Sequence, residues 1–158
     1  MRVVYCGMDK SLILAYLGGL IDGEGHIGIK RSYSTRECKS RTFHERLSVG
    51  MQQRTALVML SQRFGGTVVP RSQVNTSFRV ARPYFVWEIA DRMAASACTV
   101  LLPYLRIKRK QAMLVLKLRA SKDRGYKRPA GGLMDSRVIE YRERLYRRVR
   151  ALQSYDRP

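Results

Sequence analysis

The nine residues from Leu17 to Gly25, L-G-G-L-I-D-G-E-G, constrain this chain more than any other segment. They join an apolar helical stretch directly to the carboxylate of Glu24, which stands between two glycines. Glycine in a helix interior costs about 1 kcal/mol relative to alanine, so the adjacent Gly18 and Gly19 need a packing reason. The segment therefore predicts a helix that another backbone approaches closely and that ends at an acidic side chain.

The charge of the chain indicates what kind of partner it meets. Its 158 residues suit one domain with a proper core, and its 31 Lys and Arg residues against 12 Asp and Glu residues give a net charge of +19. Such a chain repels itself unless it binds a polyanion, and nucleic acid is the usual one. A generic basic protein, such as a ribosomal protein, remains the plain alternative.

Membrane insertion and an oxidising compartment both fit the sequence poorly. The longest apolar run, Leu12 to Leu17, is far shorter than the roughly 20 residues that span a bilayer, and the N-terminus lacks the features of a signal peptide. Cys6, Cys38 and Cys98 are widely scattered and form neither a zinc-ligand pattern nor a disulfide framework. We therefore expect an intracellular protein without a membrane partner.

Hydrophobic periodicity and capping residues predict the order of helices and strands. Asp9 or Ser11 can cap a first helix that is apolar on nearly every side and is expected to be buried on more than one face. The further predicted elements are strands His26–Arg31 and Phe43–Met51, a helix after Thr55 that ends at Gly65, a hairpin of Thr67–Pro70 and Ser77–Ala81, a helix over Tyr84–Ala97 opened by Pro83, a helix ending near Leu118, and a basic helix over Ser136–Gln153.

This order predicts an α+β fold in which helices cover one face of a four-stranded antiparallel sheet in the order αββαββα, followed by additional C-terminal helices. We expect residues 1–120 to form the core. Residues 121–158 would form a basic linker and a C-terminal helix packed on the same domain. The other face of the sheet is then left free.

The free face of the sheet is expected to bind DNA. Arg and Lys can read guanine edges, Asn and Gln can read adenine, and a β-ribbon fits the major groove. A solvated polar face is the alternative, since every one-sided sheet has one. The candidate DNA-binding residues on the predicted strands and their loops are Lys30, Tyr33, Arg36, Lys39, Arg41, His44, Arg46, Arg71, Gln73, Asn75, Arg79 and Arg82.

Glu24 is the candidate for chemistry on the nucleic acid. Phosphodiester hydrolysis uses divalent cations to offset transition-state charge and activate water, and carboxylates are their hard oxygen ligands. If two copies of the first helix pack about a two-fold axis, both Glu24 side chains converge near that axis. One carboxylate from each subunit would then supply a metal site that faces the centre of the DNA.

The nine-residue segment resembles the motif of the LAGLIDADG homing endonucleases, with Gly18, Gly23 and Glu24 replacing two alanines and the last aspartate. The resemblance covers about residues 10 to 120. It is also specific at Gln53, within the segment M-Q-Q-R-T, and at Lys108, within L-R-I-K-R-K-Q-A. It implies that Glu24 and the Gly23 carbonyl bind metal, that Gln53 orders the attacking water, and that Lys108 polarises the scissile phosphate.

The resemblance also has a departure and a structural member. Leu57 stands where relatives place a basic residue on the first turn of the second helix, and Arg54 or Arg63 are the nearby candidates to replace it. Asp22, the first acid of the motif, is structural in the resemblance and ranks below Glu24 as a metal ligand.

The chain carries one complete motif, which implies that the active enzyme is a homodimer. Residues Ala130 to Ser136 resemble a degraded second copy, but too few residues follow for a second sheet, so we interpret them as a helix start. The dimer interface would then use Ala15, Gly18 and Gly19.

The function that the resemblance implies is an intron-encoded, site-specific endonuclease that cuts both strands of a long pseudo-palindromic double-stranded DNA target in the presence of Mg²⁺. Mn²⁺ or Ca²⁺ are further cations for the same site, and the family leaves short 3′ overhangs. An RNA maturase that binds its own intron RNA, or a non-cleaving DNA-binding regulator, are the alternatives. Such proteins tend to lose the nuclease residues, whereas this chain keeps Glu24, Gln53 and Lys108. Bacterial cytoplasm, chloroplast and mitochondrion all remain open as locations.

Overall fold

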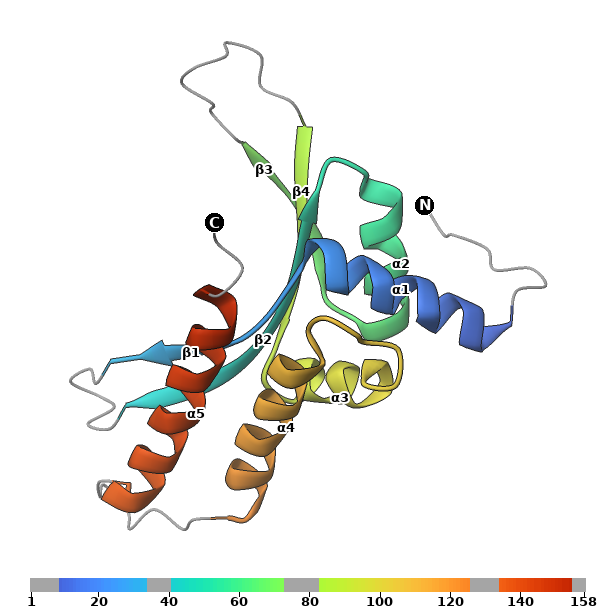
Figure 1. The fold of residues 1–158 in the computed structure, drawn as a ribbon. Coiled ribbons are helices and arrows are strands. Elements are labelled where there is room, and N and C mark those ends of the chain that lie inside the picture. The colour runs from blue at the N-terminus through green and yellow to red at the C-terminus, as the bar shows by residue number, and fades with distance from the viewer. Residues whose placement is uncertain (1–8, 34–40, 73–82, 126–133, 155–158) are drawn as a thin grey trace.

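The computed structural model describes residues 9–33, 41–72, 83–125 and 134–154 (Figure 1). In chain order these residues form a helix and two strands, a second helix and two strands, and then three helices. The elements are α1 Lys10–Glu24, β1 Gly25–Ser32, β2 Thr42–Met51, α2 Arg54–Phe64, β3 Thr67–Ser72, β4 Pro83–Ala90, α3 Asp91–Leu101, α4 Arg109–Asp123 and α5 Ser136–Ser154. The predicted αββαββα order is confirmed.

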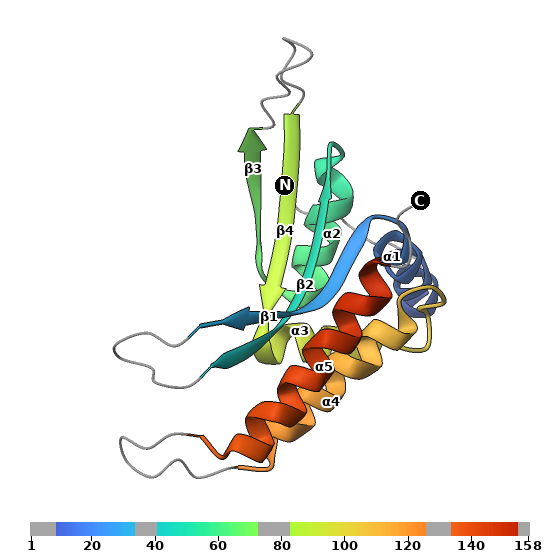
Figure 2. The same ribbon diagram turned by 60° about the vertical axis from the view of Figure 1, so that its left-hand side comes forward.

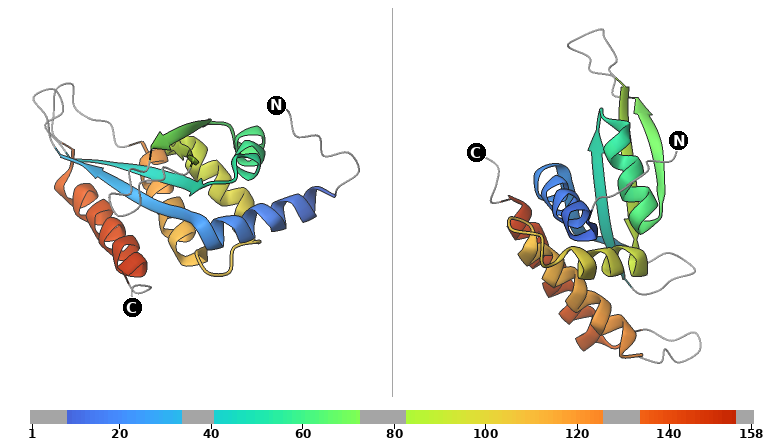
Figure 3. Two further views of the ribbon diagram at one scale, coloured as in Figure 1. Left: turned by 90° about the horizontal axis from the view of Figure 1, so that it is seen from above. Right: turned by 90° about the vertical axis from the view of Figure 1, so that its right-hand side faces the viewer.

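The four strands form one antiparallel sheet in the order β1-β2-β4-β3. Buried and partly exposed residues alternate along β2, with Phe43, Leu47 and Val49 on the buried face. Figures 2 and 3 show the helices gathered on that side of the sheet. The predicted α+β class, with helices on one face of a four-stranded antiparallel sheet, is therefore confirmed.

The predicted helix over Tyr84–Ala97 is wrong in its first half. Residues Pro83–Ala90 form β4, which pairs with β2 on one side and β3 on the other, and α3 begins only at Asp91. The aromatic and β-branched residues from Tyr84 to Trp87 suit a pleated, half-buried surface. Pro83 occupies the first position of the strand, where its missing N–H is tolerated. The predicted strand Ser77–Ala81 lies outside the described residues.

Helix α1 has one buried and one exposed side, contrary to the expectation that it is buried on more than one face. Ile13, Leu17 and Ile21 face the core. Leu12 and Tyr16 are 61% and 49% exposed. The helix therefore presents two large apolar side chains to solvent. Exposed apolar side chains that lie together are typical of protein–protein interfaces.

Helices α4 and α5 lie side by side and run in opposite directions (Figures 1 and 2). Arg142 of α5 donates hydrogen bonds to the Ser121 hydroxyl and carbonyl oxygens at 3.0 and 3.1 Å. Helix α4 continues to Asp123, so residues 121–123 belong to a helix and not to the predicted linker. Among the described residues, no helix is long and apolar enough to cross a membrane.

A buried carboxylate ties α4 to the sheet. Glu45 of β2 is fully buried and accepts hydrogen bonds from Arg119 at 3.0 Å and from Lys122 at 2.6 Å. Replacing Glu45 with Gln should lower the free energy of unfolding by about 3 kcal/mol, because the two cations lose their shared anion inside the protein. Urea unfolding would measure this loss. An unchanged unfolding midpoint would show that the contacts of Glu45 with Arg119 and Lys122 do not stabilise the fold.

Candidate active site and nucleic-acid interface

The junction between α1 and β1 places Glu24 at the surface. Glu24 is the last residue of α1 and is exposed, and Gly25 is buried at the first position of β1. A Cβ atom at Gly25 would lie 2.6 Å from the Ile21 carbonyl oxygen, so only glycine fits this tight change from helix to strand. The local sequence thus turns the chain sharply and leaves the acid before the turn accessible.

Asp22 organises the segment that leads into α4. Its carboxylate is buried and accepts hydrogen bonds from three main-chain N–H groups, those of Arg106 at 2.6 Å, Ile107 at 3.1 Å and Lys108 at 2.8 Å. Both carboxylate oxygens are used in these bonds. This arrangement fits the structural role expected for Asp22. It also fixes the position of the Lys108 main chain, from which the Lys108 side chain extends.

The side chain of Lys108 returns to the end of α1. Its ammonium donates to the carbonyl oxygens of Ile21 at 3.0 Å, Asp22 at 2.6 Å and Gly23 at 3.4 Å. These last carbonyls carry the negative end of the helix dipole, which favours a cation at that position. The Lys108 ammonium therefore contacts the residue that directly precedes Glu24, although Lys108 and Glu24 are 84 positions apart in the sequence.

Replacing Asp22 with Asn should lower both stability and any activity that depends on Lys108. An amide presents an NH₂ group to donors that now meet a carboxylate, so about 2 kcal/mol of unfolding free energy should be lost. Asp123→Asn is the matched control, because among the described residues that exposed acid has a single partner, a surface ion pair with Arg119 at 3.4 Å. Thermal unfolding of both variants would measure the loss. If the Asp22 and Asp123 variants were equally stable, the role proposed for the Asp22 carboxylate would be wrong.

Gln53 lies at the same end of the β1–β2 pair as Glu24. Gly25 pairs with Val49, and Gln53 follows β2 as the residue that precedes α2. The Gln53 side chain is exposed and makes no capping hydrogen bond to α2. The fold therefore brings Glu24 and Gln53 to the same end of the β1–β2 strand pair, where the exposed Gln53 amide can bind another group.

The first turn of α2 also shows why Leu57 departs from the basic residue of the resemblance. Leu57 is fully buried in the core, where a charged side chain would be strongly disfavoured. Arg54 is exposed next to Gln53, with its guanidinium 5.9 Å from the centre of the Phe85 ring. Arg63 lies near the other end of α2. Of the two candidates to replace the basic residue, Arg54 is therefore the one that lies beside Gln53.

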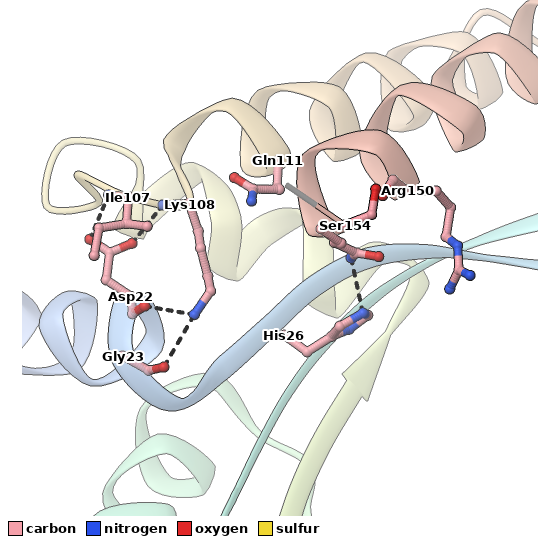
Figure 4. A pocket seen from close by; sticks show the side chains of 9 residues that line it. Asp22, Gly23, His26, Ile107, Lys108, Gln111, Arg150 and Ser154 are labelled. Carbon is pink, nitrogen blue, oxygen red and sulfur yellow. Dashed lines mark hydrogen bonds between the residues drawn. The ribbon is translucent and has the colours of Figure 1, made fainter. Parts of the chain in front are cut away.

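An open pocket of about 730 Å³ adjoins the end of α1 (Figure 4). It is bounded by α1, the start of β1, the segment leading into α4, and the last turns of α5. Its lining residues are Asp22, Gly23, His26, Ile107, Lys108, Gln111, Arg150, Gln153 and Ser154. Burial lowers the pKa of His26, and the positive charges of Lys108 and Arg150 lower it further against the opposing effect of its hydrogen bond with Gln153.

The donors at this site fit part of a hard-cation site. The Glu24 carboxylate and the Gly23 carbonyl are oxygen ligands of the kind that Mg²⁺ and Ca²⁺ prefer. The Lys108 ammonium, 3.4 Å from the Gly23 oxygen, shows that these carbonyls already attract a cation. Within the part of the chain that the structure describes, no group of three or more His, Cys, Asp or Glu residues is placed to hold a metal.

Four of the candidate DNA-binding residues share the face of the sheet opposite the core. Lys30 pairs directly with His44, Arg46 lies two positions along β2 from His44, and Arg71 points the same way through its pairing with Tyr84. Lys30 and Arg71 are exposed. The basic side chains on this face thus come from β1, β2 and β3, and β4 contributes none.

Several of these candidates already have partners within the chain. His44 contacts the Asp91 carboxylate at 3.1 Å, and Arg46 forms an ion pair with Glu88. The Asp91 pKa is lowered because the hydrogen bonds and charges of Lys122 and His44 outweigh the effect of its burial. Two further candidates flank the strands: Arg41 lies 3.8 Å from Glu143, and Tyr33 accepts a hydrogen bond from Arg31 at 2.9 Å. Arg36, Lys39, Gln73, Asn75, Arg79 and Arg82 lie outside the described residues.

The three small residues expected at a dimer interface have different surroundings. A Cβ atom at Gly18 would lie 2.8 Å from the Tyr104 Cβ atom, so the close approach to Gly18 is made within this chain. At Gly19 a Cβ atom would meet no described atom within 4 Å, and Ala15 is exposed. Gly18 thus has an intramolecular role, whereas Ala15 and Gly19 lie on the exposed side of α1.

The sequence did not predict that residues of β1 and α5 would line one pocket. The basic helix Ser136–Gln153 was predicted, but its composition does not indicate which element its last turn contacts. In the structure the Gln153 amide donates to the Ile27 carbonyl oxygen at 3.0 Å and lies 2.9 Å from the His26 ring nitrogen. These contacts join segments more than 120 residues apart, beyond the reach of any local pattern.

Comparisons with known proteins agree with this geometry at the level of the fold. No family model matches the sequence, and no curated protein matches it. The chain is similar in structure to the homing endonuclease I-CvuI in complex with DNA, with a TM-score of 0.70, 23% identity, and coverage of 90% of this chain and 82% of that chain.

Two further solved structures extend the likeness. The archaeal intron-encoded homing endonuclease I-Vdi141I, complexed with DNA, has a TM-score of 0.69 at 10% identity and covers 91% of this chain and 86% of that chain. The LAGLIDADG homing endonuclease I-LtrWI, bound to target DNA, has a TM-score of 0.54 at 14% identity, over 73% of this chain and 39% of that chain. Together with the motif at Leu17–Gly25, these likenesses show that the protein has the fold of the LAGLIDADG homing endonucleases.

Proposed function

We propose that this protein is an intron-encoded, site-specific DNA endonuclease that acts as a homodimer and depends on Mg²⁺. The observation that carries the proposal is the convergence of Lys108 on the carbonyl oxygens that immediately precede Glu24. A carboxylate, a main-chain carbonyl and an ammonium at one accessible edge form a set suited to phosphodiester hydrolysis. Structural neighbours that were solved with DNA support the same substrate.

The exposed side of α1 supports a homodimer. Leu12, Ala15, Tyr16 and Gly19 follow the i, i+3, i+4, i+7 pattern of one helix face and are all exposed, so they form one apolar stripe along the helix. The stripe ends beside Gly23 and Glu24. If two copies pack along it about a two-fold axis, the self-complementary contact brings both Glu24 carboxylates together. Each chain would then hold half of a shared active site.

The residues of the site have distinct roles in this proposal. Glu24 and the Gly23 carbonyl would hold Mg²⁺, which supplies charge neutralisation and water activation when bound. The Lys108 ammonium would donate a hydrogen bond to the non-bridging oxygen of the scissile phosphate. Gln53 would orient the water for in-line attack. Asp22 would keep Lys108 in position through the main-chain bonds that it accepts.

The open face of the sheet would lie along the DNA. Lys30 and Arg71 are exposed on that face, where they can reach bases or phosphates. His44 and Arg46 would either keep their acidic partners and stay oriented by them, or exchange them for DNA. A dimer with two such sheets would cover a pseudo-palindrome of about two helical turns.

Cleavage of a randomised duplex library tests the proposed function. The protein would be incubated with the library in Mg²⁺ and in EDTA, and the cut ends would be sequenced. We expect one pseudo-palindromic site to be recovered in Mg²⁺ and none in EDTA. Cutting in EDTA would contradict the metal dependence, and the recovery of no site in Mg²⁺ would contradict the endonuclease function.

A further inference from the structure

The last turns of α5 form one wall of the pocket beside the proposed catalytic residues. Lys108 lines the side of the pocket next to α1, and Arg150 and Ser154 come from the end of α5 (Figure 4). Gln153 also lines the pocket and contacts β1 at the Ile27 carbonyl oxygen. The roles proposed above for hydrolysis use no residue of α5. The position of this helix therefore needs a separate explanation.

Specific contacts hold the end of α5 in place. The Gln153 amide donates to the Ile27 carbonyl oxygen at 3.0 Å and lies 2.9 Å from Nε2 of His26. A Cβ atom at Gly28 would lie 2.6 Å from the His26 ring and 3.0 Å from the Gln153 nitrogen, so the glycine makes room for this contact. The last turns of α5 are thus fixed on β1, close to the point where Glu24 precedes the strand.

The charges around the pocket favour an anion. Lys108 and Arg150 both line it, so two positive charges border the same space. Among the described lining residues Asp22 is the one acid, and it uses both carboxylate oxygens for main-chain N–H groups. Arg150 is exposed, and no carboxylate among the described residues lies within 4.0 Å of its guanidinium.

We propose that Arg150 binds a backbone phosphate of the DNA next to the scissile phosphate, so that the C-terminal helix is part of the substrate-binding site. A guanidinium can hold two phosphate oxygens at once, and the pocket has room for neighbouring groups of one strand between Lys108 and Arg150. Gln153 is a positioning residue, because it fixes the turn that carries Arg150. This inference rests on the proposed endonuclease function.

Arg150→Gln and Arg148→Gln form a matched pair for the test. Both arginines are exposed on α5, and each substitution removes one positive charge, but Arg148 lines a different groove, between α4 and α5. Binding to the duplex recovered from the library would be measured in Ca²⁺ over a range of salt concentrations. We expect R150Q to weaken binding about tenfold and to reduce the salt slope by about one, and R148Q to change both far less.

Gln153→Ala tests the positioning role. It should weaken DNA binding in the wild-type background and have little further effect when Arg150 is already Gln, because the two residues act through one contact. Equal effects of Q153A in the two backgrounds would overturn the positioning role. If the wild-type protein cuts its site and R150Q binds like R148Q, the phosphate contact is wrong and the endonuclease function stands. If the wild-type protein binds no DNA, both proposals fail.

Discussion

Replacing Glu24 with Gln should reduce DNA cleavage by about 10³-fold or more while DNA binding is retained. Glu24 is exposed at the end of α1, so the neutral amide keeps the shape of the side chain without disturbing the core. The amide is a far poorer ligand for a hard divalent cation. Losing several kcal/mol of transition-state stabilisation corresponds to a rate loss of this size.

Single-turnover cleavage in Mg²⁺ and duplex binding in Ca²⁺ would measure the two effects separately. Glu140→Gln is the matched control, because Glu140 is an exposed glutamate near the start of α5 and its substitution makes the same charge change. We expect this control to cleave like the wild type. Substantial cleavage by the E24Q variant in Mg²⁺ would show that Glu24 does not hold the metal.

Replacing Gly19 with Leu should convert the protein to a folded monomer that does not cleave DNA. A Cβ atom at position 19 would meet no described atom within 4 Å, and Gly19 is exposed, so a longer side chain there can extend into solvent in the monomer. Leucine is also the better helix former, by nearly 1 kcal/mol. In the proposed dimer the same side chain would hold the two α1 helices apart and separate the Glu24 carboxylates.

Analytical ultracentrifugation would give the oligomeric state, thermal unfolding would show that the fold is intact, and a cleavage assay would report activity. Ala120→Leu, on the exposed side of α4, is a control that adds a similar apolar side chain elsewhere. We expect this control to stay dimeric and active. A G19L variant that remains dimeric and cuts both strands would exclude the α1 stripe as the dimer contact.

Gly18 shows how far a motif can be interpreted without coordinates. The adjacent glycines correctly indicate that a backbone approaches α1 closely, but the sequence does not say whose backbone it is. The structure assigns the contact at Gly18 to Tyr104 of the same chain and leaves Gly19 open. A pattern of small residues specifies the need for a close approach, and only the tertiary arrangement identifies the partner.

The strand β4 shows a limit of the same kind. A proline followed by an apolar run is compatible with the start of a buried helix and with a central strand, since both bury most of their side chains. The choice at Tyr84–Ala90 is made by β2 and β3, which offer hydrogen-bonding partners on both sides. Such pairing depends on segments that are distant in the chain, and local periodicity carries no signal for it.

The sequence by itself determined the αββαββα order, the helical motif with its terminal acid, and the basic residues on one face of the sheet, because each of these depends on side chains within a few positions of one another. It did not determine the position of β4. Only the tertiary structure decided that Lys108 caps the helix that carries Glu24, and that α5 brings Arg150 and Gln153 to the same pocket. These contacts join residues that are 85 to 126 positions apart. They form when the core closes, and their geometry follows from packing that no short stretch of sequence contains.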